Sequence, residues 1–145
     1  MNIKQIKESD IAKLADVFVS VFNSPPWNEE WTYDWAFDRL QMIFWSYRFY
    51  GYWVEVDRKP VAAVFARLGS YKGALELEII ENFVAESYQR RGVGSTLLDR
   101  LKEIAVKDGI ECFVLQTDKN TFARNHYIKY GFKSHEENLL MSYEF

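Results

Sequence analysis

Residues Asn82 to Leu98 read NFVAESYQRRGVGSTLL, and this stretch combines a strand end, a polar turn, a glycine-containing loop and a helix start. Gly92 and Gly94 leave backbone that a ligand can approach without a Cβ in the way. Apolar residues then recur at helical spacing, which predicts a helix beginning at about Gly94. Unpaired N–H groups and the positive end of a helix dipole meet in such a loop. The stretch therefore predicts an anion site for a phosphate-bearing ligand.

Two common nucleotide-binding loops do not fit this stretch. A dinucleotide fingerprint needs a third glycine, but Leu97 stands at that position. A Walker-type loop needs Gly-Lys-Ser/Thr, and no lysine follows Gly94. A simple glycine turn ahead of an ordinary helix remains an alternative when the loop is considered alone.

Two motifs in this half of the chain resemble one family. The pattern Gln89-x-x-Gly92-x-Gly94, placed after a strand that ends at Val84, resembles the acetyl-CoA-binding signature of the GCN5-related N-acetyltransferase (GNAT) family. A second signature of the family has its counterpart downstream, in the run Asn120-x-x-Ala123-x-x-x-Tyr127-x-x-Tyr130-Gly131-Phe132. The resemblance is close from about Leu75 to Lys133 and loose elsewhere.

The resemblance implies a single N-acetyltransferase domain over residues 1–145, of the α/β (α+β) class. We expect a GNAT-like fold, with a mixed, twisted β-sheet, helices on both faces and a splayed cofactor cleft between strands 4 and 5. The length suits one domain with one sizeable core.

Hydrophobic periodicity and turn residues place the expected elements along the chain. The predicted helices are Ile11–Phe22, a segment from Thr32 to Phe44, Gly94–Lys107 and Phe122–Tyr130. The predicted strands are a short one at Ile3–Ile6, then Gly51–Val56, Val61–Leu68, Leu75–Val84, Glu111–Thr117 and Asn138–Phe145.

The alternation of the strand Leu75–Val84 changes partway along it. Leu75, Leu77 and Ile79 face one way and the intervening acids the other, but apolar and acidic residues exchange sides at Ile80–Glu81. A β-bulge at that point explains the exchange.

Composition and charge limit the classes of molecule that the protein is expected to bind. A net charge of −3 argues against nucleic acid, since phosphate-backbone binding needs a basic surface. The same charge is weakly consistent with a cationic small molecule. No segment has the length of a membrane span and no apolar leader opens the chain, so we expect no membrane association. Cys112 is the only cysteine, which favours a reducing, cytoplasmic setting. We expect a monomer or homodimer without a metal.

The family resemblance assigns residues to acetyl-CoA. It places the pyrophosphate on backbone N–H groups of the loop, with hydroxyl or N–H donors from the first helical turn. It also places the pantetheine arm beside the end of the preceding strand, where the Val84 N–H would polarise the thioester carbonyl. The implied cofactor-binding residues are Val84, Ala85, Gln89, Arg90, Arg91, Gly92, Val93, Gly94, Ser95, Thr96 and Asn120.

Transfer of an acetyl group to an amine requires proton transfers. A primary amine is mostly an ammonium ion at pH 7, so a proton acceptor is needed. Glu81 is the predicted base, with Glu78 and Glu76 as further candidates; these acids would otherwise form a solvated strand face. Tyr127 occupies the position of the family's general acid, which would protonate the departing thiolate. A packing role is the alternative for this ring.

The first half of the chain is rich in aromatic residues, which make up 17% of the sequence. Most of these rings are expected in the core. Trp27 and Trp31, in a loop with Glu29 and Glu30, are predicted to bind an organic cation through their ring faces, together with Glu78. The expected acceptor is thus a small cationic amine. A protein N-terminus, a lysine side chain, or a non-catalytic acyl-CoA sensor on the same fold are the alternatives.

Overall fold

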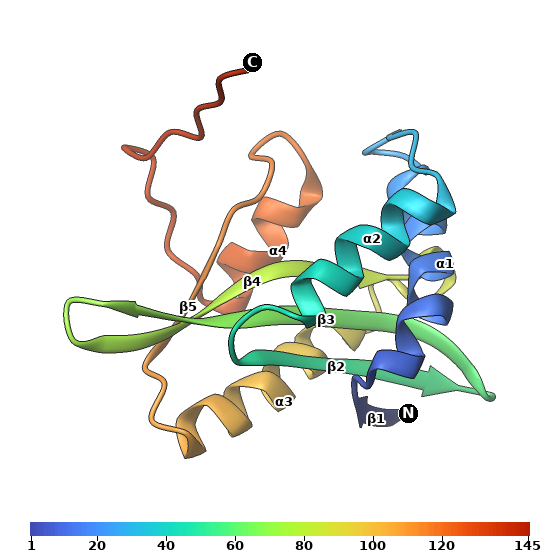
Figure 1. Cartoon of the computed structure of the whole chain (residues 1–145), viewed down its shortest axis with the longest axis horizontal. Helices are drawn as coiled ribbons and strands as arrows, with labels where there is room; N and C mark the ends of the chain where they lie inside the picture. Colours follow the sequence, from blue (N-terminus) through green and yellow to red (C-terminus); the bar gives the residue numbers. More distant parts are fainter.

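Five strands form one mixed sheet in the order β1-β2-β3-β4-β5 (Figure 1). The computed structural model describes all residues from Met1 to Phe145. Neighbours from β1 to β4 are antiparallel, and β5 runs parallel to β4. The strands are β1 (Asn2–Gln5), β2 (Phe49–Val56), β3 (Lys59–Tyr71), β4 (Ala74–Val84) and β5 (Cys112–Leu115).

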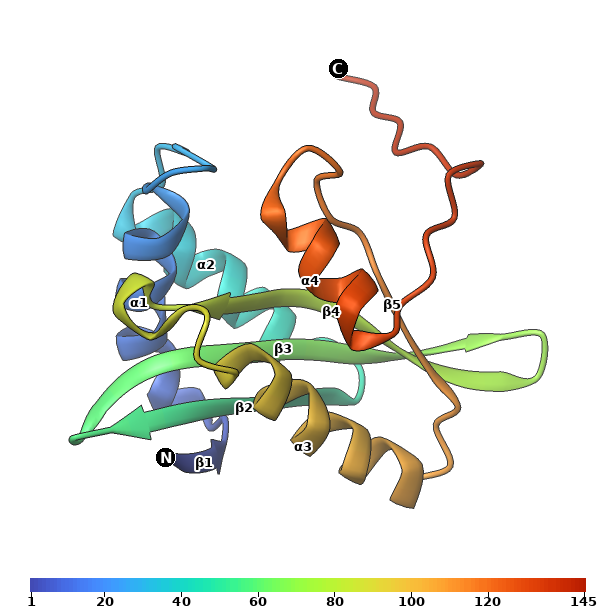
Figure 2. The same ribbon diagram turned by 180° about the vertical axis from the view of Figure 1, so that it is seen from behind.

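The helices cover both faces of the sheet, as predicted (Figure 1 and Figure 2). One face carries the first two helices, and the other face carries the last two. The four helices are α1 (Ile11–Phe22), α2 (Tyr33–Phe44), α3 (Val93–Lys107) and α4 (Phe122–Tyr130). The predicted cap of α2 is confirmed, because the Trp35 N–H donates to Thr32 Oγ1 at 3.1 Å.

The central strand β3 is buried on both faces, which explains its continuous apolar run. Val64 and Ala66 face the core beneath α3, while Ala63 and Phe65 face the core beneath α1 and α2. Side chains alternate across a strand, so β3 contributes to both cores. The sheet thus separates two apolar layers.

The predicted bulge in β4 is confirmed. Phe65 pairs with Glu81 and the next residue of β3, Ala66, pairs with Ile79, so Ile80 is an extra residue in β4. Ile79 packs in the core beneath α3, whereas Phe83 packs in the core beneath α1 and α2. In a regular strand both residues would share one face. The bulge therefore changes the face of every later side chain of β4.

β4 and β5 pair over a short length only. Their register runs from Glu76 opposite Cys112 to Ile79 opposite Leu115, and β5 ends there. The predicted strand Glu111–Thr117 is therefore longer than the observed one. From the bulge to Val84, β4 has no partner on the β5 side. The two strands therefore separate at the carboxyl end of β5.

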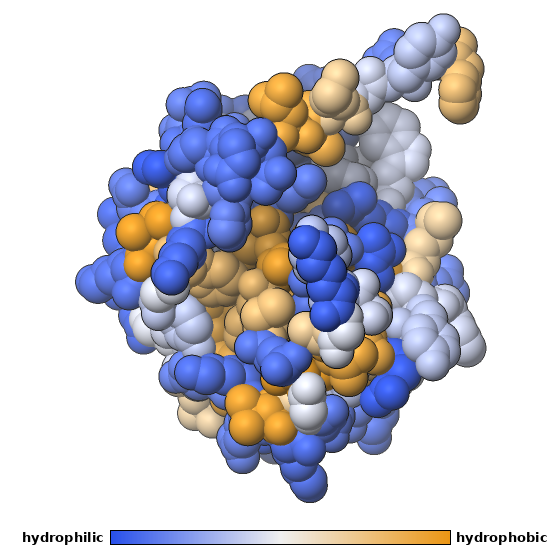
Figure 3. All heavy atoms as spheres, turned by 90° about the vertical axis from the view of Figure 1, so that its left-hand side faces the viewer, coloured by the Kyte–Doolittle hydropathy of each residue, from blue (hydrophilic) through white to orange (hydrophobic).

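The predicted strand Asn138–Phe145 is wrong for this structure. A turn closed by the Asn138 N–H and the His135 carbonyl at 3.1 Å directs the terminal residues away from the sheet. They form no helix or strand, because a strand needs a partner for its backbone groups and these residues do not pair with the open edge of β5. The space-filling view shows this terminus standing apart from the body of the protein (Figure 3).

Candidate active site

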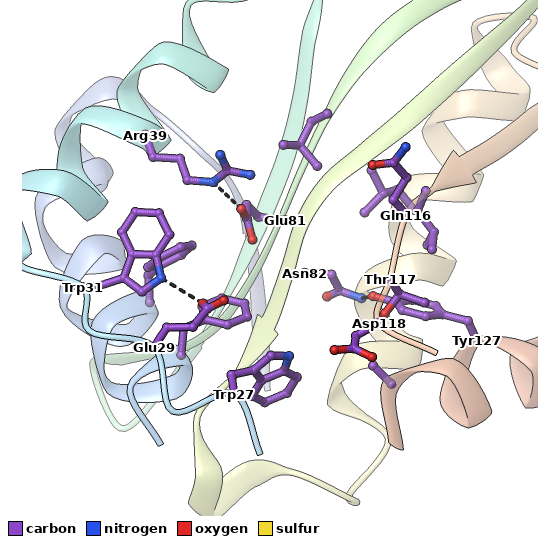
Figure 4. Close-up of a pocket in the computed structure, with 16 residues that line it drawn as sticks. Trp27, Glu29, Trp31, Arg39, Glu81, Asn82, Gln116, Thr117, Asp118 and Tyr127 are labelled. Atoms are coloured by element: carbon purple, nitrogen blue, oxygen red, sulfur yellow. Dashed lines mark hydrogen bonds and ion pairs between the residues drawn. The ribbon is translucent and has the colours of Figure 1, made fainter. Parts of the chain in front are cut away.

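A cavity of about 320 Å³ opens where β4 and β5 separate (Figure 4). One wall comes from α1, α2 and the loop between them, and the other from α4 and the chain that follows β5. Ligand pockets typically measure about 300–1,000 Å³, so this cavity suits a small molecule. The ionisable side chains in its lining are Glu29, Arg39, Glu81, Asp118 and Tyr127.

Glu81 enters this cavity from the face that carries α2. Only 8% of the residue is exposed, and its Oε1 accepts a hydrogen bond from Arg39 Nε at 2.5 Å. Burial raises the pKa of the Glu81 carboxyl above its ordinary value, although the Arg39 guanidinium acts in the opposite direction. A buried carboxylate whose pKa is raised is better matched to proton transfer near neutral pH than an exposed one.

Tyr127 reaches the same cavity from α4, on the opposite face of the sheet. Its hydroxyl oxygen accepts a hydrogen bond from Asn82 Nδ2 at 3.3 Å. Because this bond uses a lone pair of the oxygen, the phenolic hydrogen is left free to donate elsewhere. Burial raises the pKa of Tyr127, so the hydroxyl keeps its proton at neutral pH.

Trp27 and Trp31 both line the cavity, where the sequence predicted an acceptor site. The Trp31 Nε1–H donates to Glu29 Oε1 at 2.9 Å. The Asn23 side chain holds this loop, because it accepts from the Trp31 N–H and donates to the Trp31 carbonyl at 2.8 and 2.9 Å. Both rings also contact core phenylalanines edge to face. They thus pack and line the cavity at once.

The cavity is acidic overall. Glu29, Glu81 and Asp118 contribute carboxylates, and Arg39 is the basic side chain among the lining residues. Figure 4 shows Glu29 and Glu81 on the α2 side of β4 and Asp118 on its other side, near Tyr127. A positively charged ligand is favoured in such a site.

The loop before α3 has the geometry of an anion site. Gly92 is the residue before the first helical turn and lies in the left-handed region at φ 78°. The backbone N–H groups from Arg90 to Ser95 donate no hydrogen bond within the protein. Arg90 and Arg91 are exposed beside them. Free N–H groups, a helix N-terminus and two cations together suit a pyrophosphate.

The end of β4 offers a free backbone edge at Val84. The Ala85 N–H donates to the Val61 carbonyl at 2.7 Å and the Ala85 carbonyl accepts from the Tyr88 N–H at 2.8 Å. Both backbone groups of Ala85 are therefore engaged. Hydrogen-bonding direction alternates along an antiparallel strand, so the Val84 N–H points away from β3, toward the gap. The Gln89 side chain donates to the Val84 carbonyl at 2.9 Å.

The predicted residues Glu78 and Asn120 lie outside the cavity, as do the predicted cofactor-binding residues at the end of β4 and in the α3 loop. Glu78 pairs with Arg67 at 3.0 Å outside it, because it precedes the bulge and lies where β4 is still paired with β5. Asn120 is exposed in the loop before α4, where its N–H donates to Asp118 Oδ1 at 2.7 Å. Asp118 lines the cavity instead.

Asn82, Arg39 and Asp118 are among the lining residues that were not singled out from the sequence. Asn82 directly follows the predicted base, and the bulge combined with strand alternation could have placed it on the α4 side. Arg39 and Asp118 carry no local signal, because each is one of many charged residues on a helix or in a loop. Only the tertiary fold brings Arg39 to Glu81 and Asp118 to the same cavity.

A sequence model of the acetyltransferase (GNAT) family matches residues 13–132. The chain belongs to this family. A search among curated proteins finds no relative. The confirmed fold and both sequence motifs agree with this membership, and members of the GNAT family use acetyl-CoA.

Solved structures of similar fold include several GNAT enzymes. An aminoglycoside acetyltransferase from an uncultured soil metagenomic sample, in complex with sisomicin, has a TM-score of 0.77 at 19% identity and covers 99% of this chain and 95% of its own. An aminoglycoside N-acetyltransferase in complex with CoA has a TM-score of 0.77 at 15% sequence identity. The match covers 99% of this chain and 93% of that enzyme. A ribosomal-protein-alanine N-acetyltransferase from Brucella melitensis biovar Abortus 2308 has a TM-score of 0.79 at 13% sequence identity. The match covers 99% of this chain and 100% of that protein. At these identities the likeness shows the fold alone.

Two further properties of this GNAT protein follow from its side chains and helices. No group of three or more His, Cys, Asp or Glu side chains is placed to hold a metal ion. None of the helices combines the length and the apolar character that crossing a membrane would require.

The anion loop can be tested with a pair of matched glycine substitutions. Gly92 and Gly109 both have φ 78°, and a Cβ at either would meet no protein atom within 4 Å. Gly92→Ala and Gly109→Ala should thus cost similar backbone strain. At Gly92 the added Cβ would stand between the loop N–H groups and the pyrophosphate. Loss of one such hydrogen bond to a charged group costs about 1.5–3 kcal/mol. We therefore expect calorimetry to show CoA affinity at least about tenfold lower for Gly92→Ala and unchanged for Gly109→Ala.

Equal CoA affinity in the two variants would contradict the assignment of the loop. Gly94 is a poorer choice for this test, since a Cβ there would lie 3.4 Å from His126 Nε2 on α4 and disturb the packing as well.

Proposed function

We propose that this GNAT protein transfers the acetyl group of acetyl-CoA to a primary amine of a small cationic acceptor, by direct attack in a ternary complex. The observation that carries the proposal is the cavity itself. It gathers the carboxylates of Glu29, Glu81 and Asp118 beside aromatic rings, next to a phenol whose proton is free to donate. An ammonium group fits this combination of charge and ring faces.

The cosubstrate would lie between the α3 loop and the gap after β5. The loop N–H groups from Arg90 to Ser95 would hold the pyrophosphate, and Arg90 and Arg91 would add positive charge. The free Val84 N–H would pair with the thioester end. We leave Ala85 and Asn120 out of this arrangement, because the backbone of Ala85 is engaged and Asn120 is exposed in the loop before α4, where its N–H donates to Asp118. Acetyl-CoA supplies the activated acyl group.

Glu81 would accept the proton of the bound ammonium, directly or through a water molecule. Its burial favours this role by raising its pKa. Arg39 would hold the carboxylate in position through the bond from Nε. An N–H aimed at the developing oxyanion, as proposed for Val84, contributes on the order of 100-fold to rate in other acyl-transfer enzymes.

Tyr127 would protonate the departing thiolate. The bond from Asn82 Nδ2 orients the phenol oxygen and leaves its proton for donation. Asn82 Oδ1 is buried without a hydrogen-bond partner, which supports a site where a donor from a ligand is needed. Asn82 is thus proposed to position Tyr127 and to contact the substrates.

Acetyl-CoA turnover on an amine panel tests the proposal. We expect thiol release with polyamines or aminoglycosides, and little with a neutral amine or with peptides that offer an N-terminal or lysine amine, because a cavity of about 320 Å³ suits a small acceptor. Preference for the peptides would favour a protein acetyltransferase. Acetyl-CoA binding without thiol release on any amine would favour a non-catalytic sensor.

Tyr127→Phe should lower kcat and leave acetyl-CoA affinity nearly unchanged. The ring still packs against Phe132, and only the proton donor is lost. General acid–base contributions are roughly 100- to 10,000-fold. Steady-state kinetics on one good amine, with calorimetry as the binding control, measures both quantities. A decrease of less than about threefold would assign the proton transfer to water or to another group.

Glu81→Gln should reduce kcat/KM most at neutral pH and less as the pH approaches the pKa of the amine. At high pH the acceptor arrives neutral, so a base becomes dispensable. In the parent, the raised pKa of Glu81 should place the acid limb of the pH–rate profile above that of an ordinary glutamate, since the base must be deprotonated. Profiles of parent and variant on one amine provide the measurement.

The same profiles separate the base role from simple attraction of the cation. If Glu81 only attracts the acceptor, Glu81→Gln should chiefly raise the KM for the amine and make it less sensitive to salt. A loss of kcat that stays constant from neutral to alkaline pH would exclude the base role and leave Glu81 as a positioning residue.

A further inference from the structure

Helix α2 carries an exposed stripe on the side that faces away from the sheet. The residues of the stripe share one helix face and are Trp35, Asp38, Met42 and Trp45. The buried residues of the helix lie on its opposite side and are Ala36, Leu40 and Ile43. Figure 1 shows α2 as an outer layer in front of the sheet. Trp35, Met42 and Trp45 are 61%, 76% and 66% exposed, and large apolar side chains gathered on one exposed face mark a contact surface.

The spacing of the α2 stripe reads the same in both directions. Intervals of three, four and three residues separate its members, and a tryptophan stands at each end. When two such helices lie antiparallel, the order along one is the reverse of the order along the other. Trp35 of one copy then lies opposite Trp45 of the second copy, and Asp38 lies opposite Met42. Every member of the stripe thus finds a counterpart in a second copy of the same helix.

The charges at the two ends of α2 suit the same arrangement. Asp34 is exposed in the first turn of the helix, and Arg48 is exposed just beyond the last turn. In an antiparallel pair, Asp34 of each copy would lie beside Arg48 of the other. The two Asp38 carboxylates would be offset by about 6 Å along the helix axis, so they would not face each other directly.

We propose that the α2 stripe is the interface of a homodimer, in which two α2 helices pack antiparallel about a two-fold axis. Such a contact is self-complementary and closes after two copies. Tyr47 lies next to the end of the stripe and is 79% exposed. Aromatic side chains bury roughly 150–250 Å² each when fully covered, so the partly exposed Trp35, Trp45 and Tyr47 of both copies, with Met42, would provide about 1,000 Å² in total. That area is at the lower end for a specific interface, so we expect the dimer to dissociate on dilution.

Sedimentation equilibrium over a concentration series is the first test. We expect a dimer for the parent chain. Met42→Glu should raise the dimer dissociation constant at least about tenfold, because it places a second carboxylate opposite Asp38 at two symmetric contacts. Met42→Lys should keep the dimer, since an ammonium group at that position would face Asp38. Val106→Glu is the control, because Val106 is 65% exposed on α3, at the other face of the sheet, and it should leave the dimer unchanged.

Three results would overturn the proposal. A parent chain that remains monomeric up to its solubility limit would assign the stripe to a different protein partner. A dissociation constant for Met42→Glu equal to that of the parent would place the interface elsewhere. Equal weakening by Met42→Glu and Met42→Lys would contradict the pairing of Met42 with Asp38. Circular dichroism should show that each variant is folded, since the side chain of Met42 is exposed.

Cross-linking tests the direction of the two helices. Cys112 is the only cysteine, and it is replaced by serine in every chain used. A tagged Asp34→Cys chain is mixed with an untagged Arg48→Cys chain, and a short bismaleimide is added. We expect a link between tagged and untagged chains, because these positions lie side by side in the antiparallel pair and the second Asp34–Arg48 contact is left intact.

A mixture of tagged and untagged Asp34→Cys chains is the matched control. In the antiparallel pair the two copies of this position are about 18 Å apart along the axis, so these chains should not link. A link between them, without one in the first mixture, would show parallel helices and overturn the proposed arrangement.

The interface does not depend on the proposed acetyl transfer. Mass and cross-links are measured without acetyl-CoA or an amine. A dimer held by α2 that shows no acetyltransferase activity would support the interface while contradicting the proposed function.

Discussion

The extra residue Ile80 in β4 is the constraint on which the candidate site depends. Side chains alternate across a strand, so one inserted residue reverses the face of everything after it. Glu81 thereby lies with α2 and Arg39, while Asn82 lies with α4 and Tyr127. Without the insertion the carboxylate would point into the apolar core beneath α3, where its charge would be uncompensated. The bulge thus places an acid and a phenol from opposite faces of the sheet at one opening.

That opening exists because β5 is short. Pairing with β4 ends at Ile79 and Leu115, and the free backbone beyond it faces a gap rather than a neighbouring strand. The two ends of the gap carry opposite charge. Exposed arginines and free N–H groups gather at the start of α3, whereas the carboxylates of Glu29 and Glu81 lie on the cavity side toward α1 and α2. An anionic cosubstrate and a cationic acceptor would accordingly approach from different sides and meet in the gap.

The sequence predicted those features that depend on neighbours along the chain. The reversal of apolar and acidic residues indicated the bulge, and the glycine spacing with the apolar periodicity after it indicated the loop and the start of α3. Thr32 indicated the start of α2. Predictions that needed a distant partner did less well. Glu78 lies outside the cavity in an ion pair with Arg67, and Asn138–Phe145 forms no strand, because a strand requires an edge to pair with and not only an alternating pattern.

By itself, the sequence determined the bulge and the position of the glycine loop before α3, since both follow from local periodicity and backbone freedom, and its two motifs indicated the fold class through the family resemblance. The tertiary structure alone decided which charges surround Glu81. Arg39 is 42 residues away from Glu81 along the chain. From the sequence alone, any of the many other basic residues could equally well pair with Glu81. Only the packing of α2 on the sheet selects one of them. The environment of an ionisable group is set by burial and by the nearest charges in space, and neither can be read from adjacent residues.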